Sequence, residues 1–319
     1  MNTPGKTHHL RRAATPAGHF VILAIDHRAN LRASLDKHAP HPLTDDEFTA
    51  FKQTVMAHLA PLASGVLVDP AYGIGPGIAS GNIDAHRGLL APLEVTDYSV
   101  HPSQRTMQLI PGWSVAKIKK VGGDGVKLLL NYHPDAADAA EKRALVARIV
   151  EECATHDIPF FLEPLAYSLA PARSLPGDEL RQVVIDMART FSAMGVDVLK
   201  LQFPVDARQE TDRNRWRAAC RELAAACTVP WALLSAGVDY ATFAEQARIA
   251  CEAGASGVIV GRAIWAEAVA LQGAARDAFL ASTARARMQE LAAICAVYAA
   301  PWNKHATPPE WTGDWYMAS

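Results

Sequence analysis

The feature that most constrains the fold is a regular alternation of short apolar runs with longer helical stretches, beginning near residue 19. The apolar runs are rich in Val, Ile, Leu and Phe, and the segments between them repeat apolar residues at helical spacing. Several runs are almost continuously apolar, as expected of parallel strands that are covered on both faces. The predicted strands are residues 19–28, 65–72, 93–98, 125–132, 159–164, 196–203, 229–234 and 257–260.

Eight such units predict an α/β fold, the (β/α)8 TIM barrel. After the last strand, an Ala-rich segment at 273–299 predicts a C-terminal helix. We expect an N-terminal tail at 1–18, the barrel with its C-terminal helix at 19–300, and a C-terminal tail at 301–319. The C-terminal tail is aromatic, and we expect it to pack on the barrel, contact another subunit or cover the pocket. Its large rings belong to Trp302, Trp311, Trp315 and Tyr316.

Charge and composition exclude several classes of partner. Lys and Arg number 31 against 33 Asp and Glu, a formal charge of -2, so no overall field attracts nucleic acid or an anionic membrane. The basic residues near the start precede no apolar run of the kind found in secretory signals. No segment reaches the ~20 apolar residues that a membrane-spanning helix needs. We expect a cytoplasmic protein that forms a homo-oligomer.

Charged residues stand where the predicted strands end, which is where barrel enzymes place their active sites. Lys127 lies in the fourth strand, Glu163 ends the fifth and Lys200 lies in the sixth. A strand lysine points either outward between helices or into the barrel. Two strand lysines on either side of a strand that carries a carboxylate favour a functional site. Further candidates end the first and second strands: Asp26, His27, Arg28 and Asp69.

The two lysines and the carboxylate suit chemistry on a carbonyl compound. An amine attacks a ketone only when it is neutral, and burial or a nearby cation lowers a lysine pKa toward that state. Lys127 is the natural second cation for Lys200. The resulting iminium is an electron sink for carbon–carbon cleavage, and Glu163 can carry protons to and from substrate oxygens. A structural salt bridge from Glu163 to one lysine is the alternative, and it leaves the other lysine unexplained.

Small and basic residues after the seventh and eighth strands indicate a phosphate site. Ser235, Ala236 and Gly237 follow one strand, and Gly261 and Arg262 follow the next. Barrels commonly bind phosphate at these two positions with backbone N–H groups and a nearby cation. Small residues after strands also occur in ordinary turns. The presence of both motifs at the two favoured positions makes phosphate binding the preferred interpretation.

The sequence does not supply a convincing metal site. The Asp26-His27-Arg28 cluster offers one histidine among scattered acids, and the five cysteines lack the spacing of a metal site. We expect neither a metal nor another cofactor.

Taken together, the motifs of this chain resemble those of the tagatose-1,6-bisphosphate aldolase (LacD-like) family, which also includes the sulfofructosephosphate aldolases. The motifs are AIDHR, GVLVDPAYG, WSVAKIKKVGGDGVKLLLNY, FFLEPLAY, VDVLKLQFP, LLSAG and GVIVGRAIW, in this order between about residues 19 and 270. The resemblance implies a class I mechanism without a metal. His27 stands where the family often has Gln, and the C-terminal tail is unfamiliar.

The resemblance also implies residue roles. Lys200 would carry the Schiff base, Glu163 would be the acid and base, and Lys127 and Asp26 would support the site. The remaining candidates would bind substrate or phosphate, and they are His27, Arg28, Ser235, Ala236, Gly237, Gly261 and Arg262.

The activity expected is cleavage of a ketose 1-phosphate or 1,6-bisphosphate, such as tagatose 1,6-bisphosphate, to dihydroxyacetone phosphate and an aldehyde. One alternative is a sulfofructose-1-phosphate aldolase, whose second product is sulfolactaldehyde. A sugar-phosphate isomerase or epimerase could use Glu163 as a base without needing Lys200. A non-catalytic sugar-phosphate sensor would keep the pocket without turnover.

Overall fold

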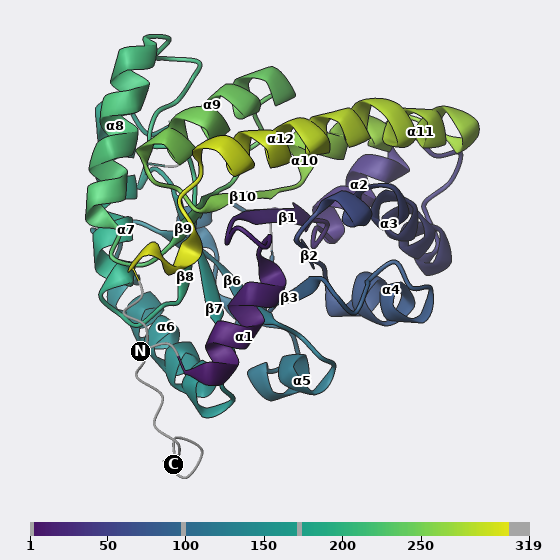
Figure 1. Cartoon of the computed structure of the whole chain (residues 1–319), viewed down its shortest axis with the longest axis horizontal. Helices are drawn as coiled ribbons and strands as arrows, with labels where there is room; N and C mark the ends of the chain where they lie inside the picture. Colours follow the sequence, from purple (N-terminus) through teal and green to yellow (C-terminus); the bar gives the residue numbers. More distant parts are fainter. Residues whose placement is uncertain (1–2, 97–99, 171–173, 306–319) are drawn as a thin grey trace.

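The computed structural model describes residues 3–96, 100–170 and 174–305, and its centre is a closed parallel barrel (Figure 1). Each strand pairs with its neighbour in parallel, and the first strand also pairs with the last. The predicted (β/α)8 barrel is therefore confirmed. Around the barrel, the strands are β1 Phe20–Ala24, β2 Gly65–Leu67, β3 Gly88–Pro92, β6 Gly125–Tyr132, β7 Phe160–Ala166, β8 Val198–Leu201, β9 Trp231–Leu233 and β10 Gly257–Val260.

The third barrel strand was predicted in the wrong place. The prediction put it at 93–98, but the strand in the barrel is β3, which ends at Pro92. The chain then leaves the barrel, and β4 Glu94–Val95 pairs antiparallel with β5 Gln108–Leu109 in a small separate sheet. The end of the predicted segment, residues 97–98, lies outside the described residues.

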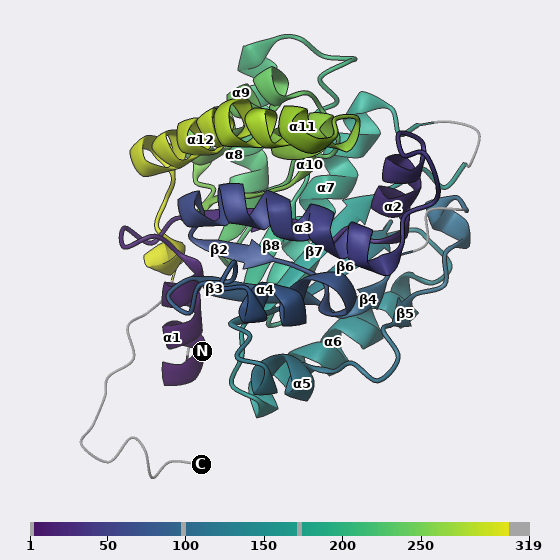
Figure 2. The same cartoon turned by 90° about the vertical axis from the view of Figure 1, so that its right-hand side faces the viewer.

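Helices cover the outside of the barrel (Figures 1 and 2). In α7, Val184, Met187 and Phe191 recur at helical spacing and lie fully buried. A capping box at Thr44 and Glu47 fixes the start of α3. The α-helices are α1 Pro4–Ala13, α2 Ala29–Asp36, α3 Asp45–Leu59, α4 Gly75–Ala79, α5 Val115–Lys120, α6 Ala139–Thr155, α7 Gly177–Ser192, α8 Arg213–Ala226, α9 Tyr240–Ala253, α10 Arg262–Trp265, α11 Gly273–Phe279 and α12 Arg285–Tyr298.

The predicted C-terminal helix is present as α11 and α12, joined through one π-helical stretch, Leu280–Ala284. Figure 2 shows this long helix lying beside α3. In the segment assigned to an N-terminal tail, residues 4–13 form α1, which begins at the cap residue Thr3. Within the described residues, no helix is long and apolar enough to cross a membrane.

The barrel interior is divided into an apolar end and a charged end. Helix α1 lies against β3 and β6 at the apolar end. There, Leu10 and Ala13 of α1 join Trp302 and a layer of inward-pointing strand residues in one buried cluster. That layer is Phe20, Ile22, Ala24, Leu67, Leu90, Phe161, Val198, Ala232 and Ile259. Continuing each strand toward its carboxyl end leads from this layer to the charged candidates.

Candidate active site

The pleat of the strands points both lysines and the glutamate into the barrel. Successive strand residues face opposite sides of a sheet, so residues two apart share a face. Lys200 therefore faces inward with Val198, and Glu163 faces inward with Phe161. The register of β6 with β7 sets Leu129 opposite Glu163 and Lys127 opposite Phe161. The alternative of an outward, snorkelling Lys200 does not occur.

One carboxylate oxygen holds the two lysines together. The Nζ atoms of Lys200 and Lys127 lie 2.9 and 3.0 Å from the same Oε2 atom of Glu163. The three residues are 5%, 2% and 6% exposed respectively, so the contact is shielded from water. Strand β7 stands between β6 and β8, as predicted. The competing interpretation, in which Glu163 pairs with only one lysine, is wrong.

Lys127 is surrounded by acids. Its Nζ lies 3.0 Å from Oδ2 of Asp26 and 2.7 Å from Oε1 of Glu94, in addition to the Glu163 contact. Although burial opposes the charged form, Asp26, Glu163 and Glu94 raise the pKa of Lys127 well above its ordinary value. Lys127 therefore carries a permanent positive charge beside Lys200.

The three acids differ in their tendency to hold a proton. Burial alone would raise all three pKa values, but the charges of Lys127 and Lys200 keep the pKa of Asp26 and of Glu163 below the ordinary range. For Glu94, burial dominates over the charge of Lys127 and raises the pKa of the carboxyl. Glu94 is thus the site carboxyl that is most easily protonated.

His27 and Arg28 follow Asp26 on the loop after β1. The His27 ring packs edge-on against Trp265, with 5.4 Å between ring centroids. Burial lowers the pKa of His27 to about 4, and the charge of Arg262 contributes to the shift. The guanidinium of Arg28 donates a hydrogen bond to the main-chain carbonyl of Glu94. The Arg28 side chain therefore reaches toward the end of β3.

The predicted phosphate residues lie at the ends of the adjacent strands β9 and β10. Ser235 is buried, whereas Ala236 and Gly237 are exposed. Both exposed residues have positive φ, 47° at Ala236 and 80° at Gly237. Such a backbone is unusual for alanine, and strained conformations of this kind are common at functional sites. A turn of this shape can aim successive N–H groups at an anion.

Gly261 and Arg262 complete this side of the site. A Cβ atom at Gly261 would lie 2.6 Å from the Ala24 carbonyl oxygen, so only glycine lets β10 approach the end of β1 this closely. Arg262 begins α10 and is exposed. Its positive charge contributes to the lowered pKa of His27.

Two charged residues of the site were missed by the sequence analysis. Glu94 was placed inside the wrongly positioned strand. Lys52 is fully buried in α3 and contacts both the Asp69 carboxylate and the carbonyl oxygen of Ile25, the latter at 3.0 Å. Lys52 thereby holds the backbone immediately before Asp26.

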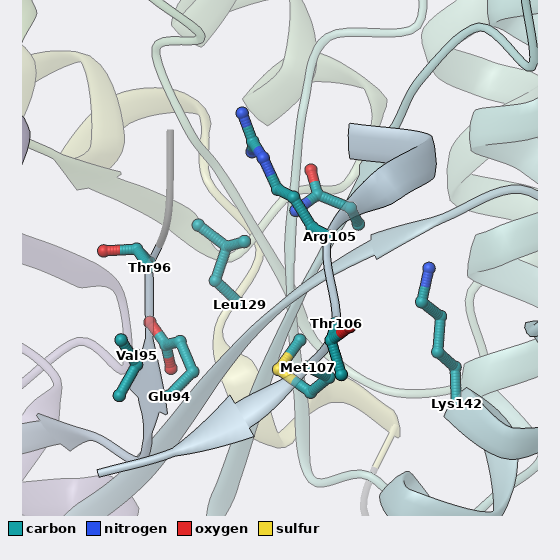
Figure 3. Close-up of a pocket in the computed structure, with 9 residues that line it drawn as sticks. Glu94, Val95, Thr96, Arg105, Thr106, Met107, Leu129 and Lys142 are labelled. Atoms are coloured by element: carbon teal, nitrogen blue, oxygen red, sulfur yellow. The ribbon is translucent and has the colours of Figure 1, made fainter. Parts of the chain in front are cut away.

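Two hollows open beside these residues. One lies next to Glu94 and is drawn in Figure 3, which shows Glu94 on one side and Lys142 of α6 on the other. Its lining residues are Glu94, Val95, Thr96, Arg105, Thr106, Met107, Leu129, Asn131 and Lys142. The other hollow lies beyond the ends of β7, β8 and β9, and Gln202, Ala236 and Gly237 are among the residues that line it. Across the described ranges, no group of three or more His, Cys, Asp or Glu side chains could hold a metal ion.

Comparisons with known proteins concern the chain as a whole. A family model described as DeoC/LacD family aldolase matches residues 20–267. The tagatose 1,6-diphosphate aldolase of Streptococcus agalactiae is 36% identical over 286 residues, which cover 84% of this chain and 87% of that protein. Tagatose 1,6-diphosphate aldolase 2 of Enterococcus faecalis is 34% identical over 324 residues, which cover 94% and 96% respectively.

Solved structures share the barrel at lower identity. The fructose-bisphosphate aldolase of Plasmodium falciparum superposes with a TM-score of 0.67 at 12% identity, covering 93% of this chain and 95% of that one. A Schiff-base-forming fructose-1,6-bisphosphate aldolase gives a TM-score of 0.60 at 19% identity, covering 91% and 99%. At such identities the likeness shows the fold alone.

Fold and relatives together define this protein as an aldolase, which is a lyase. The chain belongs to the DeoC/LacD aldolase family.

Proposed function

We propose that the protein is a class I aldolase that cleaves a ketose 1-phosphate or 1,6-bisphosphate through a Schiff base on Lys200. The contact of Lys200 and Lys127 with one oxygen of the buried Glu163 carries this proposal. It puts an amine, a fixed cation and a proton acceptor within one hydrogen-bonded group. The names of the relatives add support for tagatose 1,6-bisphosphate as a substrate.

In this mechanism the Lys200 amine attacks the ketone carbon C2, and loss of water leaves an iminium ion. The C3–C4 bond then breaks, and its electron pair moves to the iminium to give an enamine. Glu163 accepts the proton of the C4 hydroxyl, and the aldehyde leaves. Protonation of the enamine at C3 and hydrolysis release dihydroxyacetone phosphate and free the Lys200 amine.

Two neighbours assist without forming bonds to the substrate. Lys127 keeps its charge among three acids and holds Glu163 in place. Asp26 contributes to that charge and is itself positioned by Lys52, which contacts the preceding carbonyl. Groups held in this way need no reorganisation during the reaction, which is the main source of electrostatic catalysis.

The phosphate on C1 would bind on the β9–β10 side. The turn at Ala236 and Gly237 can supply N–H groups, and Arg262 supplies a positive charge. Ser235 and Gly261 stand at the same strand ends. A phosphate bound there would lie next to β8, which carries Lys200.

The test is borohydride trapping followed by peptide mass spectrometry, with a panel of ketose phosphates that includes tagatose 1,6-bisphosphate and sulfofructose 1-phosphate. We expect a covalent adduct on the Lys200 peptide and its loss in Lys200→Met. The matched control is Lys6→Met, because Lys6 is a buried lysine at the opposite end of the barrel, 2.8 Å from Asp197. Turnover should persist in EDTA, since the iminium needs no Lewis acid. An adduct on Lys127 would exchange the roles of the two lysines, and metal-dependent turnover would overturn the class I mechanism.

A further inference from the structure

Of the two carboxylate oxygens of Glu94, one has a hydrogen-bond partner among the described residues and the other has none. Its Oε1 atom accepts from Lys127 at 2.7 Å. Its Oε2 atom is buried and has no hydrogen-bond partner among the described residues. The side chain is 1% exposed and lines the hollow shown in Figure 3.

A purely structural role explains this arrangement poorly. Lys127 already has the carboxylates of Asp26 and Glu163, at 3.0 Å each, so it does not need a third partner. Leaving a buried polar atom unpaired costs about 1–3 kcal/mol. Burial also raises the pKa of Glu94, which means that the fold disfavours its charged form. Residues that cost stability in this way are concentrated at functional sites.

The contacts also show on which side of Lys200 the Glu94 carboxylate lies. The chain of contacts runs from Lys200 to Glu163 at 2.9 Å, on to Lys127 at 3.0 Å, and to Glu94 at 2.7 Å. It crosses the barrel mouth from β8 through β7 and β6 to the end of β3. In the proposed mechanism C2 is on Lys200 and the C1 phosphate lies toward β9 and β10. The half of the ketose beyond C4 therefore extends toward Glu94.

We propose that Oε2 of Glu94 binds a hydroxyl group on the aldehyde half of the ketose, in the hollow lined by Thr96, Leu129 and Asn131. The inference rests on the proposed function and deepens it, because it names the residue that distinguishes aldehydes with hydroxyl groups from aldehydes without them. A carboxylate suits this role, since it accepts hydrogen bonds from a hydroxyl and binds it more strongly than a neutral acceptor does.

The experiment runs the reaction in the direction of synthesis, with dihydroxyacetone phosphate and either glyceraldehyde or propanal. Both aldehydes have three carbons, but propanal lacks hydroxyl groups. In Glu94→Met we expect the preference in kcat/KM for glyceraldehyde over propanal to fall by roughly 10- to 100-fold, as expected for a lost hydrogen bond to a charged group. Any loss that acts through the Lys127 contact should lower the rates with both aldehydes by the same factor, so the preference between them is the readout of the hydroxyl contact. Glu94→Gln, which keeps an oxygen for Lys127, should give an intermediate preference.

Stability separates this role from a structural one. Methionine is apolar and similar in size, and it removes the unpaired oxygen, so Glu94→Met should melt at the same temperature as the wild type or higher. The control is Glu141→Met, which changes an exposed carboxyl of α6 next to Lys142, a residue that lines this hollow, and should leave the preference intact. A lower melting temperature with equal losses on both aldehydes would show a structural role and overturn the inference.

Trapping with dihydroxyacetone phosphate alone distinguishes the two proposals. This fragment ends at C3, so its adduct on Lys200 should form in both the wild type and Glu94→Met. Absence of the adduct in the wild type would reject the Schiff-base mechanism. A normal adduct together with an unchanged aldehyde preference would reject the role of Glu94 only.

Discussion

Single residues set the charge states on which the site depends, and His27 is an example whose effect can be measured. Its ring lies against Trp265, and its Nδ1 atom has no hydrogen-bond partner among the described residues. Burial lowers the pKa from an ordinary 6.5 to about 4, so the ring is neutral at neutral pH. A neutral ring beside Arg262 avoids a second positive charge on this side of the mouth.

This depressed pKa predicts a loss of stability in mild acid. Between pH 6.5 and about 4 the unfolded chain binds a proton at His27 that the folded protein does not, so stability falls as the pH falls. The loss is at most about 3–4 kcal/mol, because the shift spans about 2.5 pKa units and one unit corresponds to about 1.4 kcal/mol. His27→Gln, which introduces the residue common in the family, should flatten this slope in urea unfolding measured across the pH window. Parallel curves for the two proteins would show that His27 does not titrate in this way.

The residue scale also shows what a sequence reveals about a site. Lys127 and Lys200 could be singled out because a charge inside an apolar strand is unusual. Lys52 was missed, although helical spacing puts it on the apolar face of α3 with Phe48 and Val55, because a lone lysine in a helix is usually a surface residue. Only the fold shows that its ammonium group lies buried against Asp69 and the Ile25 carbonyl.

At the scale of elements, strands were predicted correctly where a segment held a single apolar run. The prediction failed where two neighbouring segments both resembled a strand. Residues 88–92 form β3, but the following segment contains β-branched Val95 and Thr96, which favoured it as a strand. Pro92 lacks an N–H group and ends the barrel strand. The correction has a consequence for function, because Glu94 comes two residues after the true strand end at Pro92. Side chains at that position are the ones barrel enzymes use.

The junction between β10 and α10 supports a prediction about phosphate. Arg262→Ala should lower kcat/KM for a ketose 1-phosphate by roughly 10- to 100-fold, because a charge-assisted contact to phosphate is lost. The unphosphorylated ketose should be affected much less. Arg189→Ala, at an exposed arginine of α7 paired with Asp186, is the matched control. Equal losses for both ketoses would remove Arg262 from the phosphate site.

Considered as a whole, the molecule separates stability and chemistry between the two ends of its barrel. At the amino end, α1 is held by contacts of Lys6 with Asp197 at 2.8 Å and of Arg12 with Asp124 at 2.7 Å. Trp302, which is 5% exposed, joins the same buried cluster, and its main-chain N–H donates to the Gly18 carbonyl at 2.9 Å. Of the aromatic tail, Trp311, Trp315 and Tyr316 lie outside the described residues. Trp302 itself packs in the buried cluster at this end of the barrel.

The last prediction follows from this division and concerns the end of the chain. Truncation after Ala300 removes Trp302, and we expect it to lower the free energy of unfolding by about 3 kcal/mol, at the low end of the cost of losing a buried large aromatic side chain. Truncation after His305 retains Trp302 and should cost much less. Val297→Ala, at a valine that is 71% exposed on α12, is a control for an apolar loss without burial. Chemical unfolding gives the stabilities, and borohydride trapping should give the same Lys200 adduct in every folded variant, because the site lies at the opposite end of the barrel. Equal stability of the two truncated proteins would show that Trp302 does not contribute, and loss of the adduct in the shorter one would show that the two ends are coupled.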